Sequence, residues 1–179
     1  MTQGRHPLTD GESPLLPRLK ARDAAAWAEL YDRHAAGLRA YIRRIGGRDP
    51  DDLLGETMVQ VVRDIHRFTG TDTELRAWLF GVARHRVIDD ARRRKTRPSV
   101  VEAEDEDLPA PEQEFAMPDR ETLSALLDSL TDDQREVVWL RFGADLSVEE
   151  TARTVGKTPD AVAALTLRAL RRMRRLAGQ

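Results

Sequence analysis

The sequence predicts an all-α protein of two small helical domains joined by a flexible acidic linker, with a helix-turn-helix in the second domain. Three observations lead to this prediction. Ala, Leu, Arg and Glu dominate the 179 residues, and these residue types favour helices. Apolar residues recur at helical spacing, and no alternating strand pattern competes. An acidic stretch divides the chain, because residues 101–114 hold seven Asp and Glu and no Lys or Arg.

The N-terminal part of the chain is expected to contain a short tail and the first domain. Residues 1–15 mix Gly, Pro and polar side chains, which is typical of a flexible tail. The first domain is expected to span residues 16–97. Asp23 is suited to cap a helix that continues to about Ile45, where Gly46-Gly47 would end it.

Two more helices are predicted in the first domain. Asp49-Pro50 is a start signal, because a capping residue precedes a proline at the first helical position. The helix that follows should end near Arg67, and residues 68–71, Phe-Thr-Gly-Thr, interrupt the pattern. A third helix begins at residue 72 or 73 and is expected to end before Pro98, since the residue before a proline disfavours the helical conformation.

Residues 98–118 are the predicted linker between the domains. They contain four prolines and the acidic cluster, with few large apolar side chains. Such a composition buries too little apolar surface to order a chain. We therefore expect a flexible tether. The helix before it ends in a basic run, so the charge of the protein is sorted by segment.

The second domain is expected to span residues 119–179 and to contain four short helices, the first at roughly 119–129. Capping boxes begin the second and third helices, and Thr-Pro begins the fourth. The signals are Thr131 with Gln134, Ser147 with Glu150, a stop at Gly156, and Thr158-Pro159. A short helix and a longer one joined by Gly-Lys-Thr match the helix-turn-helix plan.

Residues that carry chemistry in enzymes and metal sites form no recognisable pattern in this sequence. The chain has no cysteine, and its four histidines have no partner at metal-ligand spacing. The adjacent carboxylates Asp51-Asp52 and Asp89-Asp90 diverge on a helix, so helix-start charge and a solvated face account for them better than catalysis does. We expect no enzyme activity, no metal and no cofactor.

The N-terminus carries no long apolar run, so neither a signal peptide nor a membrane span is predicted. The absence of cysteine is compatible with a reducing compartment. We expect a protein of the cytoplasm that does not insert into a membrane.

Two segments together resemble a known family. The first is DLLGETMVQVVRDIHRF, residues 52–68, followed by ELRAWLFGVARHRVIDDARRRKTRP, residues 74–98. The second is LLDSLTDDQREVVWLRFGADLSVEETARTVGKTPDAVAALTLRALRRMRRL, residues 126–176. Their order and spacing are similar to those of bacterial RNA polymerase sigma factors of the extracytoplasmic-function (ECF) group, with RAWLF and QREVVWLRF the most specific pieces. The resemblance implies an initiation factor that binds core polymerase, directs it to promoters and helps melt the −10 element.

The resemblance assigns roles to two helices of the first domain. The acidic face of the second helix would dock on the β′ coiled coil of core polymerase; the matching residues are Asp52, Glu56, Thr57 and Gln60. The third helix and the loop before it would hold the −10 element as single-stranded DNA, which needs positive charge and a stacking surface. The residues expected there are Phe68, Arg84, His85, Arg86, Arg92, Arg93 and Lys95. Trp78 is interpreted as core. A solvent-exposed face and a solubilising basic run are the alternatives.

The last helix would contact the −35 element. Its packing stripe is predicted to be Val162, Leu165, Ala169, Met173 and Leu176. The DNA-binding residues expected on it are Thr158, Ala161, Ala164, Arg168, Arg171 and Arg172. Family members usually place Lys or Arg near position 163 and often His at 167, where this chain has Ala163 and Leu167. Alanine and leucine can touch thymine methyl groups but offer no donors, so relaxed −35 specificity is expected. A protein-binding patch is the alternative.

The partners implied by the resemblance are core polymerase, through its β′ coiled coil and β subunit, promoter DNA, and an anti-sigma factor. The acidic linker would thread toward the polymerase active centre; a plain tether is the alternative. Two other classes stay open, a stand-alone helix-turn-helix regulator that never binds core and a partner-binding helical protein. The first domain has no role in a simple repressor, which favours the initiation factor.

Overall fold

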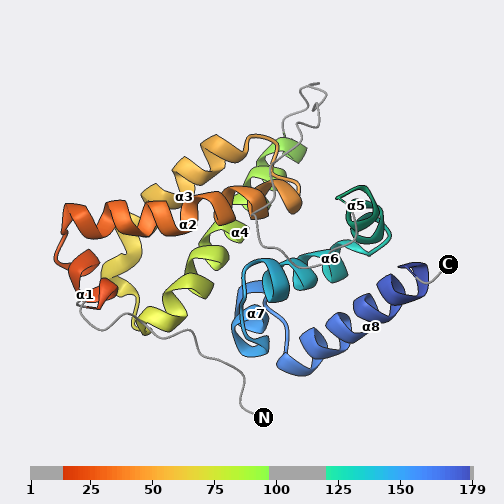
Figure 1. The fold of residues 1–179 in the computed structure, drawn as a ribbon. Coiled ribbons are helices and arrows are strands. Elements are labelled where there is room, and N and C mark those ends of the chain that lie inside the picture. Colours follow the sequence, from red (N-terminus) through yellow and green to blue (C-terminus); the bar gives the residue numbers. More distant parts are fainter. Residues whose placement is uncertain (1–13, 97–119, 178–179) are drawn as a thin grey trace, which may run out of the picture.

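The computed structural model describes residues 14–96 and 120–177, and every regular element in these ranges is a helix. The all-α prediction is therefore confirmed for the part of the chain that the structure describes. Figure 1 shows two groups of helices, α1 to α4 in orange to green and α5 to α8 in teal to blue. The predicted linker, residues 98–118, lies outside the described residues.

The first group forms a bundle in which the sequence signals act as predicted. The Asp23 carboxylate accepts a hydrogen bond from the Ala25 amide at 2.9 Å, and Asp49 accepts one from Asp52 at 3.3 Å. Gly46 adopts a left-handed φ of +89°, which ends the long helix. The elements are α1 (Leu15–Lys20), α2 (Ala24–Arg44), α3 (Pro50–Asp64), the short 3-10 helix η1 (Ile65–Arg67) and α4 (Asp72–Thr96).

Helix α1 was not predicted, because residues up to 15 read as a tail and six residues are too few for a periodic pattern. Its N-terminus is capped from far along the chain: the Leu15 and Leu16 amides donate to the Asp72 carboxylate at 2.9 and 2.7 Å. Leu15, Leu16 and Leu19 are buried against the bundle. A carboxylate at a helix N-terminus and a buried apolar face stabilise this short helix by tertiary contacts.

The second group contains the helix-turn-helix. Both capping boxes form, and Gly156 takes a φ of +68° at the end of the third helix. A π-helical turn, which the sequence did not indicate, continues the second helix to Gly143. The elements are α5 (Arg120–Asp128), α6 (Asp132–Val138), the π-helical turn η2 (Trp139–Gly143), α7 (Val148–Val155) and α8 (Pro159–Ala177).

The predicted packing stripe of α8 is correct except at its end. Val162 and Ala169 are fully buried, and Leu165 and Met173 pack against the core. Leu176 is 39% exposed, because the last turn of α8, residues 174–177, is exposed on all sides.

The two bundles share one hydrophobic core, which the sequence did not predict. Tyr41 of α2, Phe80 of α4 and Trp139 of η2 form an aromatic cluster with ring centroids 5.3 to 5.6 Å apart. Helix α4 packs along α7, and the Thr154 hydroxyl donates to the Ala77 carbonyl at 3.3 Å. The described helices therefore form a closed arrangement in which α4 is central.

Candidate nucleic-acid and partner interfaces

The outer face of α3 carries most of the predicted acidic surface. Asp52 and Glu56 are exposed, and Gln60 is half-buried. Thr57 is fully buried, and its hydroxyl donates to the Leu53 carbonyl at 2.6 Å. The expectation that Thr57 belongs to the contact surface is therefore wrong, since the helix turns this side chain into the core of its own bundle.

Two apolar residues on the same face were missed. Val59 and Val62 are each 51% exposed. They follow Glu56 by three and six residues, so they continue the outer face of the helix. Helical spacing from Glu56 would have identified them. Together Asp52, Glu56, Val59 and Val62 form what we call the α3 outer face, which combines negative charge with exposed apolar area.

The acidic residues of α3 lie next to cations of α4. Arg93 approaches the Glu56 carboxylate at 3.4 Å, and Arg86 donates to the Gln60 side-chain oxygen at 3.5 Å. Two of the arginines expected at the −10 element are thus directed toward α3 in this structure. The pairing follows from the close packing of α3 against α4.

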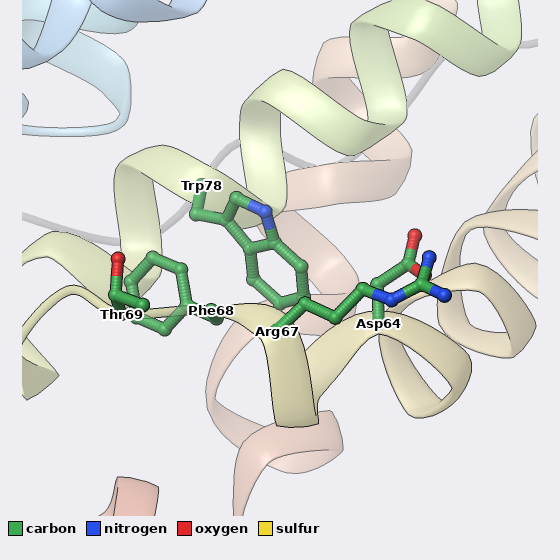
Figure 2. A pocket seen from close by; sticks show the side chains of 5 residues that line it. All are labelled: Asp64, Arg67, Phe68, Thr69 and Trp78. Atoms are coloured by element: carbon green, nitrogen blue, oxygen red, sulfur yellow. The ribbon is translucent and has the colours of Figure 1, made fainter.

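A pocket opens where η1 meets the start of α4, with a volume of about 320 Å³. Figure 2 shows the Phe68 and Trp78 rings facing each other in it, with centroids 4.9 Å apart and planes inclined by 28°. Asp64, Arg67 and Thr69 complete the lining. Trp78, interpreted from the sequence as core, does pack against the bundle core, but it is only half-buried, and its ring also stacks on Phe68 and lines this pocket.

The loop that carries Phe68 is fixed by two neighbours. The Lys20 ammonium of α1 donates to the Phe68 carbonyl at 2.7 Å. Gly70 leaves room for the aromatic ring, since a Cβ at this position would collide with the Phe68 ring. Helix α1 therefore helps to hold the predicted stacking residue, and no local sequence signal connects Lys20 to it.

Arg84 lies elsewhere than predicted. Its Nε donates to the Glu136 carboxylate of α6 at 2.8 Å, and the Tyr41 hydroxyl donates to the same oxygen at 2.7 Å. Burial, and then the neighbouring Glu136 carboxylate, raise the pKa of Tyr41, so its hydroxyl stays protonated and donates. Arg84 follows Phe80 by one helical turn, which places it at the contact between the bundles and away from the pocket.

The other basic residues predicted at the −10 site are solvent-facing where the structure describes them. His85 and Arg92 are exposed, and Arg92 lies 3.6 Å from Asp89. The side chain of Lys95 lies outside the described residues. The structure thus brings Phe68 and Trp78 together and spreads the cations along α4.

Helix α8 carries the predicted −35 residues on its solvent side. The Thr158 hydroxyl accepts a hydrogen bond from the Ala161 amide at 3.2 Å and caps the helix. Ala161 is half-buried, whereas Thr158, Ala164, Arg168, Arg171 and Arg172 are exposed. The Arg168 Nε donates to the Ala164 carbonyl at 3.2 Å, so this guanidinium lies along its own helix.

Across residues 14–96 and 120–177 no group of three His, Asp or Glu side chains is arranged to hold a metal ion. In the same ranges no helix has the length and apolar character that crossing a bilayer requires.

A helix-turn-helix in one bundle, with an aromatic pocket beside a basic helix in the other, defines a nucleic-acid-binding protein. Residues 30–97 match the family Sigma-70 region 2, and residues 120–173 match Sigma-70, region 4. The chain is 38% identical over 185 residues to the ECF RNA polymerase sigma factor BldN of Streptomyces coelicolor, covering 96% of this chain and 69% of BldN. It is 32% identical to the ECF sigma factor ShbA of Streptomyces griseus, covering 72% of each chain. The chain therefore belongs to the ECF group of sigma-70 RNA polymerase sigma factors, which are promoter-directing transcription initiation factors.

Solved structures confirm the fold of two helical domains. The sigma factor RpoE in complex with the anti-sigma factor NepR, from Bartonella quintana, matches with a TM-score of 0.67 at 22% identity, over 84% of this chain and 96% of that one. CnrH in complex with the cytosolic domain of CnrY matches with a TM-score of 0.63 at 23% identity, over 92% and 95%.

Proposed function

We propose that this sigma factor binds its partners through three separate surfaces and catalyses no reaction itself. The α3 outer face binds core polymerase, the Phe68–Trp78 pocket with the basic side of α4 binds the −10 element, and α8 binds the −35 element. The protein then acts in the cytoplasm, where polymerase and the chromosome are. The observation that supports this division most is the placement of an exposed acidic and apolar helix face next to a pocket with stacked aromatic rings.

The composition of the α3 outer face suits a protein partner with a basic surface. Val59 and Val62 supply apolar area, and exposed apolar side chains grouped with charges are typical of protein interfaces. Asp52 and Glu56 supply negative charge, which would steer association with a basic coiled coil. Thr57 acts in this proposal only by packing inside the bundle.

The pocket suits an unstacked base. Base stacking on aromatic rings tolerates every base, and a base turned out of the duplex is held by stacking on aromatic or apolar side chains. Phe68 and Trp78 supply the stacking surface, and Arg67 lies at the rim with its side chain 88% exposed. His85 and the exposed arginines of α4 would then follow the DNA backbone.

An inhibitory partner is part of this proposal. RpoE was solved with the anti-sigma factor NepR, and CnrH with the cytosolic domain of CnrY. We infer that a partner of this kind covers the α3 outer face when the sigma factor is inactive, since Val59 and Val62 are exposed without it.

Run-off transcription from a genomic fragment library, with core polymerase alone and with this protein added, tests the proposal. Start sites that require the protein are expected. Glu56→Lys should lose core binding and these transcripts, because it reverses charge on the α3 outer face. Asp32→Lys is the matched control, since Asp32 is an exposed carboxylate on α2, and it should retain both. Absence of protein-dependent start sites together with absence of core binding would show that the proposal is wrong.

A further inference from the structure

The first three turns of α8 present an apolar strip to solvent. Ala163, Ala164 and Leu167 are exposed, and Leu167 has 49% of its surface accessible. Residues three and four apart share one side of a helix, so these three side chains form a continuous strip. The strip lies opposite the buried stripe of Val162 and Ala169, so packing inside the domain does not account for it.

Three polar side chains near this strip form hydrogen bonds with the backbone of their own helix. The Thr158 hydroxyl caps the Ala161 amide, and the Thr166 hydroxyl donates to the Val162 carbonyl at 2.8 Å. The Arg168 Nε donates to the Ala164 carbonyl. Between Thr158 and Arg168 the exposed side chains of Ala163, Ala164 and Leu167 carry no hydrogen-bond donor, so the helix offers apolar groups where a recognition helix enters the major groove.

The charge of α8 identifies the kind of partner. Its second half carries five exposed arginines against the single carboxylate of Asp160; they are Arg168, Arg171, Arg172, Arg174 and Arg175. These arginines follow the apolar strip along the helix axis instead of surrounding it. A duplex combines phosphates with an apolar group on the floor of the major groove, the thymine 5-methyl, and so matches both features.

We propose that Ala163, Ala164 and Leu167 read thymine 5-methyl groups in the −35 element, so that a methyl contact replaces hydrogen-bonded readout. This inference rests on the proposed role of α8. The alanines are short, which lets the backbone approach the groove. Residues 163 and 167 are about 6 Å apart along the axis at about 1.5 Å per residue. Base pairs are spaced by about 3.4 Å, so the strip covers about two adjacent pairs.

The size of the effect follows from the area that a methyl group buries. Burial of one carbon contributes about 0.8 kcal/mol, which corresponds to about four-fold in affinity. Two adjacent thymines would then give about 15-fold discrimination. That is less than two bidentate hydrogen-bonded contacts would give, and it agrees with the relaxed −35 specificity expected from the sequence.

The test uses holoenzyme reconstituted from core polymerase and the full chain. A selection from promoters randomised in the −35 element first defines the preferred sequence. Each thymine of that element is then replaced by deoxyuridine, which removes only the methyl and keeps base pairing. We expect about four-fold weaker holoenzyme binding at one or two adjacent positions, and no change for replacements in the spacer.

Two variants connect the effect to the strip. Leu167→Ala should reduce the thymine-to-uracil affinity ratio toward one at the position it contacts. Leu176→Ala is the matched control, because Leu176 is exposed in the last turn of α8, away from the strip, and it should leave the ratio unchanged.

Equal binding of thymine and uracil at every −35 position would overturn the inference, as would a selection with no thymine preference. A Leu167→Ala variant that loses a protein partner while the ratio is unchanged would overturn it in favour of a protein-binding patch. The proposed function fails separately, through absence of protein-dependent start sites. Holoenzyme that initiates normally but does not distinguish uracil from thymine rejects methyl readout alone.

Discussion

Glu136 is a partly buried polar link between the two bundles, and its replacement by alanine should loosen their contact. Its carboxylate accepts from the Tyr41 hydroxyl at 2.7 Å and from Arg84 at 2.8 Å. Only 12% of the Glu136 side chain and 23% of the Arg84 side chain are exposed. Alanine favours helix, so Glu136→Ala should remove these contacts without disturbing α6 itself.

The magnitude follows from what each partner loses. The buried Tyr41 hydroxyl is left without its acceptor, which costs about 1–2 kcal/mol. The guanidinium of Arg84 is partly exposed and can bind water in place of Glu136. The loss of its charge-assisted hydrogen bond should therefore cost only about 1 kcal/mol of stability. The sum, about 2–3 kcal/mol, corresponds to a shift of about 30- to 150-fold in the equilibrium between closed and separated bundles.

The chain has no cysteine, so a dye pair can be placed by two substitutions at exposed sites, Asp32→Cys on α2 and Arg174→Cys on α8. Energy transfer in Glu136→Ala should decrease, and its urea midpoint should fall. Glu136→Gln keeps an acceptor oxygen for Tyr41 and should show less than half of the effect. In a double-mutant cycle, Tyr41→Phe should reduce the cost of Glu136→Ala by about 1 kcal/mol. Unchanged energy transfer and an unchanged urea midpoint in Glu136→Ala would refute this reasoning.

Four further outcomes can be measured. Gly70→Ala should weaken −10 binding several-fold, read by the fluorescence of 2-aminopurine in the element, because the new Cβ collides with the Phe68 ring; normal binding would show that the loop adapts. Lys20→Met should produce a milder loss in the same assay, since the Phe68 carbonyl loses a hydrogen bond. Arg171→Ala should lower the salt slope of duplex binding by about 1 if this arginine holds a phosphate. Burial, with the charges of Arg33 and Arg76, lowers the pKa of His34 to about 4, so the unfolded chain binds more protons between pH 6.5 and 4. Stability should therefore fall by about 2 kcal/mol as the pH falls through that window, and His34→Gln should remove this dependence.

Features fixed by neighbouring residues could be predicted from the sequence. The caps at Asp23 and Asp49, both capping boxes and the left-handed Gly156 depend on side chains within three or four residues of a helix end. Such signals are local, so the sequence displays them directly. The same holds for the apolar strip of α8, which helical spacing places opposite the buried stripe.

Contacts between distant residues could not be predicted in this way. Helix α1 depends on Asp72, more than fifty positions away, and Arg84 is directed by Glu136 of the other bundle. The burial of Thr57 is a different case. It lies four residues from Leu53 and from Val61, both buried, so the helical phase already placed it inside. The assignment of Thr57 to the polymerase-binding surface followed the family resemblance instead of this helical position, and it is wrong.

The closed arrangement of the two bundles is incompatible with the proposed contacts to both promoter elements at the same time. Elements at −10 and −35 lie about 25 base pairs apart, or about 85 Å at about 3.4 Å per pair. A compact chain of 179 residues has a radius of gyration of about 16 Å, hence a diameter of about 40 Å. The pocket at Phe68 and the strip on α8 cannot both reach their elements while the bundles share one core. On these assignments, promoter binding requires separation of Tyr41 and Phe80 from Trp139, and this separation breaks the ion pair between Arg84 and Glu136. The substitution Glu136→Ala should then increase the rate of holoenzyme formation, although it destabilises the free protein.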